Sequence, residues 1–190
     1  ILSAHQLKTL DNQTIACQNI SSADLMQRAA SKCFKWIKEN LGLNHSFSIV
    51  CGPGNNGGDG LVIARLLSED NCDVECVLLK FTENTTLDYE LNLAKLQKTD
   101  CKIHTIHSEK DLESIEFNEK IVVDSIFGFG LSRPAEGMAS KAIKQINNSK
   151  TKKVLSIDLP SGLYCDELNA KDNQIIQADI TLTFHAPNLS

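Results

Sequence analysis

Val50-Cys-Gly-Pro-Gly-Asn-Asn-Gly-Gly-Asp-Gly60 is the stretch of sequence that decides the fold. The apolar run from Phe47 to Cys51 predicts a buried strand at its start, and the apolar periodicity from Asp59 to Leu67 predicts a helix at its end. The glycines between them have the spacing GxGxxG, at which loop amides and a helix N-terminus can bind phosphate. The stretch therefore predicts a strand, a ligand-binding loop and a helix in succession.

Short apolar runs and helical periods alternate along the rest of the chain in the same way. The expected strands are 47–51, 74–79, 102–106, 121–123, 154–157 and 180–184, and the expected helices between them are 59–67, 86–96 and 138–146. Several of these runs are apolar throughout, which is typical of strands buried on both faces. The alternation predicts an α/β fold: a Rossmann-like, doubly wound, mainly parallel sheet with helices on both faces, in three αβα layers.

An N-terminal helical pair is expected before the sheet. Ser3 and Gln6 have the spacing of a capping box at the start of the first helix. The second helix opens at Ser21 and Ser22, repeats an apolar residue every fourth position from Leu25 onwards, and ends at Gly42.

Composition sets the class of protein. The chain has 190 residues, of which 42% are hydrophobic, so residues 1–190 are expected to form a single domain. A net charge of -5 without a basic cluster argues against nucleic-acid binding. The seven cysteines form no CxxC pair and are interpreted as reduced thiols of a cytoplasmic protein. No apolar run approaches the roughly 18 residues that span a bilayer, so no membrane contact is expected.

The glycine-rich loop alone leaves several functions open. A dehydrogenase of this fold usually has an acidic residue at the end of the next strand, but that strand ends in Leu79 and Lys80, which disfavours hydride transfer. The absence of Gly-Lys-Ser/Thr excludes a P-loop. Asn55, Asn56 and Asp59 add polar groups that indicate direct ligand contacts, although the same residues also favour turns and helix caps.

Two further strands are expected to end in polar loops beside this one. Asp124 follows the apolar run from Ile121 to Val123, and Asp158 follows Ile157 in the same register, with Ser161 three residues later. A single Asp at a strand end is more often a cap than a catalyst, but two in matching positions favour a functional site. Asn56, Asp124 and Ser161 together offer only hard oxygen ligands, which suit an alkali or alkaline-earth cation.

Four segments in order resemble the signatures of the YjeF N-terminal domain family, the NAD(P)HX epimerases. They are residues 50–60, Asp124-Ser-Ile-Phe-Gly-Phe-Gly130, Ile157-Asp-Leu-Pro-Ser-Gly162 and Ala178-Asp-Ile-Thr-Leu-Thr-Phe184, and Leu25-Met-Gln-Arg-Ala-Ala30 resembles the family's second helix. The resemblance implies an isomerase, NAD(P)H-hydrate epimerase, that interconverts the R and S forms of the hydrates NADHX and NADPHX in nicotinamide nucleotide repair. It further implies a functional partner, an NAD(P)H-hydrate dehydratase, while a homo-oligomer is left open.

The resemblance also assigns site residues. It implies one K⁺ per subunit, bound by Asn56, Asp124 and Ser161. The positions implied to bind the nucleotide substrate are Asn55, Asn56, Gly57, Gly58, Asp59, Gly128, Phe129, Gly130, Leu131, Ser132, Arg133, Pro134 and Asp158. In the family a further strand follows the Phe184-His-Ala-Pro187 segment, so the chain is expected to lack its last strand and any fused C-terminal dehydratase domain.

The hydrate carries a hydroxyl beside the ring nitrogen, so epimerisation can proceed by protonating and expelling that hydroxyl and returning water to the other face. Our hypothesis is that Asp124 is catalytic and exchanges this proton while Asp158 orients the nucleotide. Cation binding would lower the pKa of Asp124 and oppose this role. The alternative function is a non-catalytic YjeF-like nucleotide-binding or scaffold module, but every polar position of the loops is present, which favours the enzyme.

Overall fold

The computed structural model of the chain describes residues 2–169 and 173–184. Within these residues a six-stranded sheet has the order β3-β2-β1-β4-β5-β6, and every neighbouring pair is parallel. The strands are β1 (Phe47–Cys51), β2 (Val74–Leu79), β3 (Lys102–Ile106), β4 (Ile121–Ser125), β5 (Lys153–Ile157) and β6 (Ile180–Leu182). The predicted α/β fold with a parallel sheet is confirmed.

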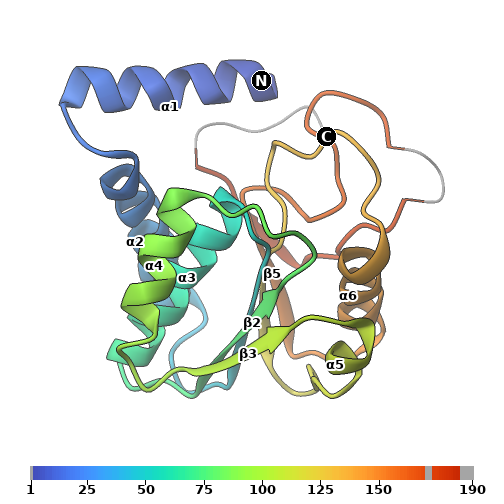
Figure 1. Cartoon of the computed structure of the whole chain (residues 1–190). Coiled ribbons are helices and arrows are strands. Elements are labelled where there is room, and N and C mark those ends of the chain that lie inside the picture. Colours follow the sequence, from blue (N-terminus) through green and yellow to red (C-terminus); the bar gives the residue numbers. More distant parts are fainter. Residues whose placement is uncertain (1, 170–172, 185–190) are drawn as a thin grey trace.

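Helices cover both faces of this sheet (Figure 1). They are α1 (Ala4–Gln18), α2 (Ser22–Asn40), α3 (Asn55–Glu69), α4 (Leu87–Leu96), α5 (Glu109–Glu113) and α6 (Gly137–Asn148). One hydrophobic core joins α2, α3 and α4 to the sheet, and a second core joins α5 and α6 to its other face. Because successive strand residues point to opposite faces, Ile49 lies in the first core and Val50 in the second.

The N-terminal helical pair is confirmed, and both helices begin with a capping box, at Ser3 and at Ser21. Helix α2 packs in the same core as α3 and α4. Gly42 follows α2 with a φ of 76°, the left-handed conformation expected of a glycine that ends a helix. Helix α1 packs elsewhere. Its buried Leu7 contacts Leu159 and Cys165 in the loop after β5, so α1 lies over the carboxyl edge of the sheet (Figure 1).

Several boundaries differ from the sequence prediction. Helix α3 begins at Asn55, four residues earlier than expected. The glycines of its first turns have low intrinsic helix propensity and therefore do not predict helix, but packing against other elements holds them in one. Strand β4 continues through Asp124 and Ser125, whose polar side chains conceal a strand in the sequence. The short helix α5 was not predicted, and β6 ends at Leu182, two residues before Phe184.

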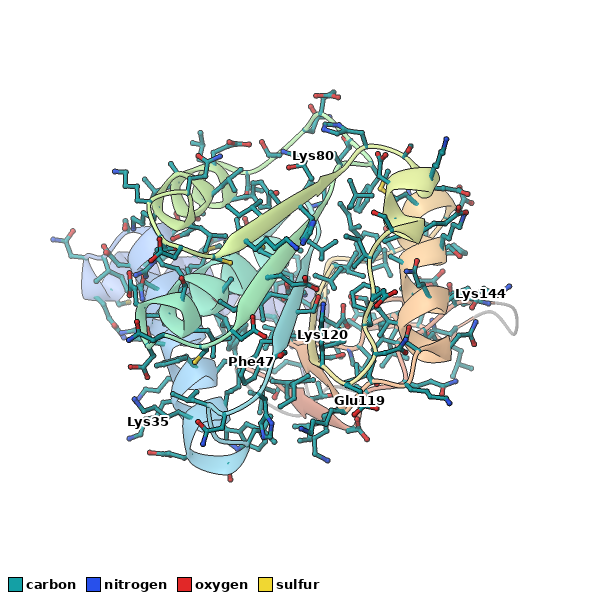
Figure 2. The ribbon with its side chains drawn as sticks, turned by 90° about the horizontal axis from the view of Figure 1, so that it is seen from below. Lys35, Phe47, Lys80, Glu119, Lys120 and Lys144 are labelled. Atoms are coloured by element: carbon teal, nitrogen blue, oxygen red, sulfur yellow. The ribbon has the colours of Figure 1, made fainter. Side chains whose placement is uncertain are left out.

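The strand order reverses between β1 and β4. The chain moves outwards from β1 to β3 and then returns to the other side of β1, so the connections after β1 and β4 leave in opposite directions. Ligands bind beside such a switch point, beyond the carboxyl ends of the strands. Figure 2 looks from below onto the opposite edge, where Phe47, Glu119 and Lys120 lie near the starts of β1 and β4.

None of the helices in the described part of the chain is long and apolar enough to cross a membrane. All seven cysteines are free thiols.

Candidate active site at the carboxyl edge of the sheet

Asp124 lies near the end of β4 and is fully buried, with 0% of its surface exposed. Its carboxylate accepts four hydrogen bonds. Oδ2 accepts from the Ser156 hydroxyl at 2.8 Å and from the Ser161 N–H at 2.9 Å. Oδ1 accepts from the Ser161 hydroxyl at 2.5 Å and from the Ile126 N–H at 3.2 Å. Residues of β4, β5 and both following loops therefore saturate one carboxylate.

Two opposing effects act on the pKa of Asp124. Burial is the larger effect and raises the pKa, whereas the hydrogen bonds from Ser161, Ser156 and Ile126 lower it. The net pKa lies above the ordinary value of an Asp. Because all four donors point at the carboxylate and no part of the side chain reaches solvent, the geometry favours an anchoring role over proton exchange with a ligand. The catalytic role of Asp124 stays a prediction.

The glycine-rich loop joins this cluster through Asn56. Its Nδ2 donates to the carbonyl oxygen of Phe127 at 2.7 Å, while the Phe127 N–H donates to the Ser161 hydroxyl at 2.9 Å. Asn56 Oδ1 is buried and accepts no hydrogen bond from any described residue. An unsatisfied buried acceptor of this kind costs about 1–3 kcal/mol unless a ligand occupies it.

The three residues predicted to bind a cation therefore lie in one hydrogen-bonded cluster, and their donor chemistry fits K⁺. The possible ligand atoms of Asn56, Asp124 and Ser161 are all oxygens, because Asn56 Nδ2 donates to the Phe127 carbonyl oxygen and leaves Oδ1 available. Within residues 2–169 and 173–184, no group of three or more His, Cys, Asp or Glu side chains could hold a metal ion. The donor set thus differs from that of a zinc site.

Asp158 directly follows β5 and borders the site. It has a φ of 69°, and its Oδ2 accepts the N–H of Phe129 at 2.8 Å. Gly128 lies between the loops: a Cβ there would stand 2.6 Å from Asp158 Oδ2 and 3.4 Å from the Asn56 side chain. A side chain at position 128 would therefore have to displace the Asp158 carboxylate.

The glycines that begin α3 bring this helix against the sheet. A Cβ at Gly57 would overlap the carbonyl oxygen of Gly52, and a Cβ at Gly60 would overlap the hydroxyl of Ser125. A Cβ at Gly58 would stand 2.8 Å from the Met26 thioether of α2. Close packing therefore accounts for much of the glycine content that the sequence reading assigned to ligand binding.

Asp59 lies in the second turn of α3 and does not cap the helix, whose N-cap is Gly54. It is 8% exposed, and its carboxylate forms no hydrogen bond or ion pair with other described residues. Burial, followed by the negative charge of Asp158, raises the pKa of Asp59 well above its ordinary value. Asp59 is therefore a buried carboxyl group that is protonated more readily than an exposed Asp.

The other predicted nucleotide-binding positions are less buried than Asp124, Asp59 and Asp158. Phe129 packs against the α1 cluster, Leu131 is half-buried, and Asn55 at the start of α3 is exposed. The rest of the loop after β4 is exposed at Gly130, Ser132, Arg133 and Pro134.

The sequence reading missed two contributors to the site. Ser156 lies opposite Asp124 in the β4–β5 ladder, a register that could have been derived by aligning the ends of the two apolar runs. The backbone of Phe127 bridges Asn56 and Ser161. Main-chain contacts of this kind leave no signal in the residue types.

The parallel sheet, the reversal of its strand order between β1 and β4 and the glycine-rich start of α3 define a Rossmann-like α/β domain, with a cluster of buried oxygen-bearing side chains at the edge where such domains bind ligands. The family model described as YjeF-related protein N-terminus matches residues 22–190. The chain belongs to this family.

Curated relatives agree with this assignment, and a solved structure shares the fold. The chain is 34% identical over 186 residues to the NAD(P)H-hydrate epimerase of Anaerococcus prevotii, covering 96% of the chain and 84% of that protein. It is also 34% identical over 187 residues to the bifunctional NAD(P)H-hydrate repair enzyme Nnr of Thermofilum pendens, covering 97% of the chain but 35% of that protein. The crystal structure of yeast ynu0, YNL200c, has a TM-score of 0.80 at 24% identity and covers 99% of the chain and 81% of the yeast chain.

Proposed function

We propose that the chain is an NAD(P)H-hydrate epimerase, an isomerase that interconverts the R and S forms of NADHX and NADPHX. Relatives with this name match it over nearly its full length, such as the proteins of Anaerococcus prevotii and Limosilactobacillus fermentum, at 34% and 31% identity. The structural observation that carries the proposal is the meeting of three loops at the switch point. Asp124, Asn56 and Asp158 come from the ends of three different strands. Hydrogen bonds through Phe127 and Ser161 connect Asn56 to Asp124, and Asp158 and Asn56 both lie close to Gly128.

The nucleotide is proposed to bind along α3 and the loop after β4. The N-cap Gly54 provides no side-chain acceptor, so the first-turn amides of α3 are available to a pyrophosphate. The residues proposed to contact the nucleotide are 55–59, 128–134 and Asp158. Asp158 is held by the Phe129 N–H, which suits it to orient a ribose or amide group.

One K⁺ per subunit is proposed to bind between Asn56, Asp124 and Ser161. The unsatisfied Asn56 Oδ1 and the ring of hard oxygens support this proposal. The cation would supply a fixed positive charge beside the buried carboxylate. The chain itself holds these ligands in place through the Ser156 hydroxyl and the Phe127 backbone.

Epimerisation requires a proton for the departing hydroxyl and a group that accepts a proton when water returns. A carboxyl group can do both within hydrogen-bonding distance of the substrate. Asp158 is proposed to orient the ring and Asp124 to hold the site together. Of the two carboxylates, only Asp124 is saturated with four described donors.

An NAD(P)H-hydrate dehydratase is the proposed functional partner, because an epimerase serves a second enzyme that consumes one epimer. The bifunctional repair enzymes of Thermofilum pendens and Moorella thermoacetica match this chain over about a third of their own length, 35% and 36%. Free thiols at all cysteines agree with the proposed cytoplasmic compartment.

The proposed function is tested with a mixture of both NADPHX epimers and a dehydratase that consumes one of them. NADPH recovery measured by absorbance should stop when that epimer is exhausted, and adding this protein should carry recovery to completion. The rate should fall when K⁺ is replaced by Na⁺ at equal ionic strength. If the hydrate binds but recovery still stops at one epimer, the chain is a non-catalytic nucleotide-binding module and the proposal is wrong.

A further inference from the structure

Three carboxylates reach the carboxyl edge of the sheet, and their surroundings differ. Asp124 accepts four hydrogen bonds and is fully buried. Asp158 accepts the N–H of Phe129 and contacts the Gly128 loop. Asp59 accepts no hydrogen bond from the described residues, yet it is more than nine-tenths buried. The least constrained carboxyl group of the site is therefore the one on α3.

The carboxylate of Asp59 also keeps contact with solvent. Asp59 retains 8% of its surface exposed. Oδ1 of Asn56, one helical turn earlier, is sealed from solvent and has no hydrogen-bond partner among the described residues. Residues three apart lie on neighbouring parts of a helix surface, so Asp59 and Asn56 border the same side of α3. Asp59 therefore adjoins the proposed nucleotide site on α3.

The described charges that act on Asp59 all have the same sign. They come from Asp158 after β5, Asp11 of α1, Asp88 of α4 and the Cys51 thiol of β1. Together with burial they favour the neutral carboxylic acid over the carboxylate. When two carboxyl groups in one site have different surroundings, one can serve as the acid and the other as an ionised acceptor.

We propose that Asp59 is the catalytic residue that exchanges the proton with the hydroxyl of the hydrate, while Asp124 positions the loops and Asp158 orients the nucleotide. This inference rests on the proposed epimerase function and replaces Asp124 in the proton-exchange step. It is carried by the absence of hydrogen bonds from the described residues to Asp59, by its burial and by its place one turn after Asn56 in α3.

The step balances without an oxidant or reductant. The Asp59 carboxyl gives its proton to the hydroxyl oxygen of the hydrate. The carbon–oxygen bond breaks with its electron pair leaving on water, and the ring-nitrogen lone pair forms a carbon–nitrogen double bond. Water then adds to the opposite face of that carbon and returns a proton to the Asp59 carboxylate. Substrate and product differ only in configuration.

The test compares Asp59→Asn with Asp100→Asn, which removes an exposed carboxylate after α4 that is not among the charges acting on Asp59. Asp59→Asn should lower kcat by about 100-fold or more, the usual contribution of a general acid or base. Its Kd for NADPH, used as a stable analogue of the hydrate, should stay within about threefold because the amide preserves side-chain volume. Asp100→Asn should keep kcat within about twofold, as expected for a change outside the reacting groups.

The assignment is wrong if active wild-type protein and Asp59→Asn have similar kcat values. Folding of Asp59→Asn is checked by circular dichroism, and Asp59→Ser is judged by the same criterion if the first variant is unfolded. A second measurement follows the hydroxyl oxygen. Wild-type epimerisation in water enriched in oxygen-18 should label the hydrate, and epimerisation without label would also overturn the proposal. Inactive wild-type protein would instead refute the epimerase function itself.

Discussion

Ser161 binds both oxygens of Asp124: its hydroxyl donates to Oδ1 at 2.5 Å, and its backbone N–H donates to Oδ2 at 2.9 Å. The two residues lie 37 positions apart in the chain, at the ends of β4 and β5. This contact joins two strand-end loops, and the Phe127 backbone extends it to Asn56 on α3. The stability of the site therefore depends on one buried carboxylate.

Replacing that carboxylate should destabilise the protein. In Asp124→Asn the amide would present N–H groups to donors that now point at a carboxylate, leaving at least one of them unsatisfied. We expect the free energy of unfolding in urea to fall by about 2–3 kcal/mol. Asp100→Asn, at an exposed position after α4, should change it by less than about 0.5 kcal/mol. Equal stability of the two variants would contradict the role of Asp124 as an anchor.

The raised pKa of Asp59 predicts how stability changes with pH. The folded protein holds this proton to a higher pH than the unfolded chain, whose Asp titrates near 3.8. Between these two pKa values the folded state binds more protons, so the free energy of unfolding falls as pH rises, by up to about 1.4 kcal/mol per pH unit for one group.

Asp59→Asn removes this titration, so urea unfolding at several pH values should give a flatter curve than the wild type. The variant should also be the more stable protein at pH 8 while being inactive. Asp124 also has a raised pKa and is present in both proteins, so only the difference between the two curves reports on Asp59. Parallel curves for wild type and variant would show that Asp59 is not held neutral.

Potassium should stabilise the protein through Asn56. A K⁺ concentration tenfold above the Kd adds about 1.4 kcal/mol to the free energy of unfolding, or about 3–6 °C in melting temperature for a chain of this size. Asn56→Ala should abolish the increase that K⁺ gives over Na⁺. Asn55→Ala, one residue earlier and exposed, should retain it. Loss of the effect in both variants, or in neither, would contradict a cation at Asn56 Oδ1.

The helical glycines should tolerate substitution only where space exists. In Gly57→Ala the new methyl group would overlap the main-chain carbonyl of Gly52, which cannot rotate away. We expect destabilisation of about 3 kcal/mol or more, measured by thermal or urea unfolding. Gly54→Ala has no atom within 4 Å of its Cβ and a negative φ, so it should lie within about 1 kcal/mol of wild type.

Much of the fold could be predicted because buried parallel strands read as continuous apolar runs. The run from Phe47 to Cys51 is a strand with the predicted bounds. Prediction failed where packing overrides propensity: Asn55 to Gly58 form helix despite two glycines, and Asp124 and Ser125 continue a strand despite their polarity. The burial that stabilises these residues comes from other elements and has no local signature.

The candidate site was also predicted in part. The sequence predicted that Asn56, Asp124 and Ser161 lie at one edge of the sheet, because the carboxyl ends of parallel strands meet there. In the structure, hydrogen bonds connect the three residues through Phe127. Proton exchange by Asp124 was the hypothesis from the sequence and stays a prediction. The residue types alone do not reveal that four hydrogen-bond donors surround this carboxylate.

The sequence by itself therefore determined the parallel sheet, its two covered faces and the edge at which polar loops gather, since periodicity and strand ends are local properties. Only the tertiary structure decided which polar groups are satisfied. Asp124 receives donors from Ser156, Ser161 and Ile126, whereas Asn56 Oδ1 and the Asp59 carboxylate receive none from the described residues. Hydrogen-bond satisfaction and desolvation depend on neighbours that are distant in the chain, and these two quantities decide what each carboxyl group can do.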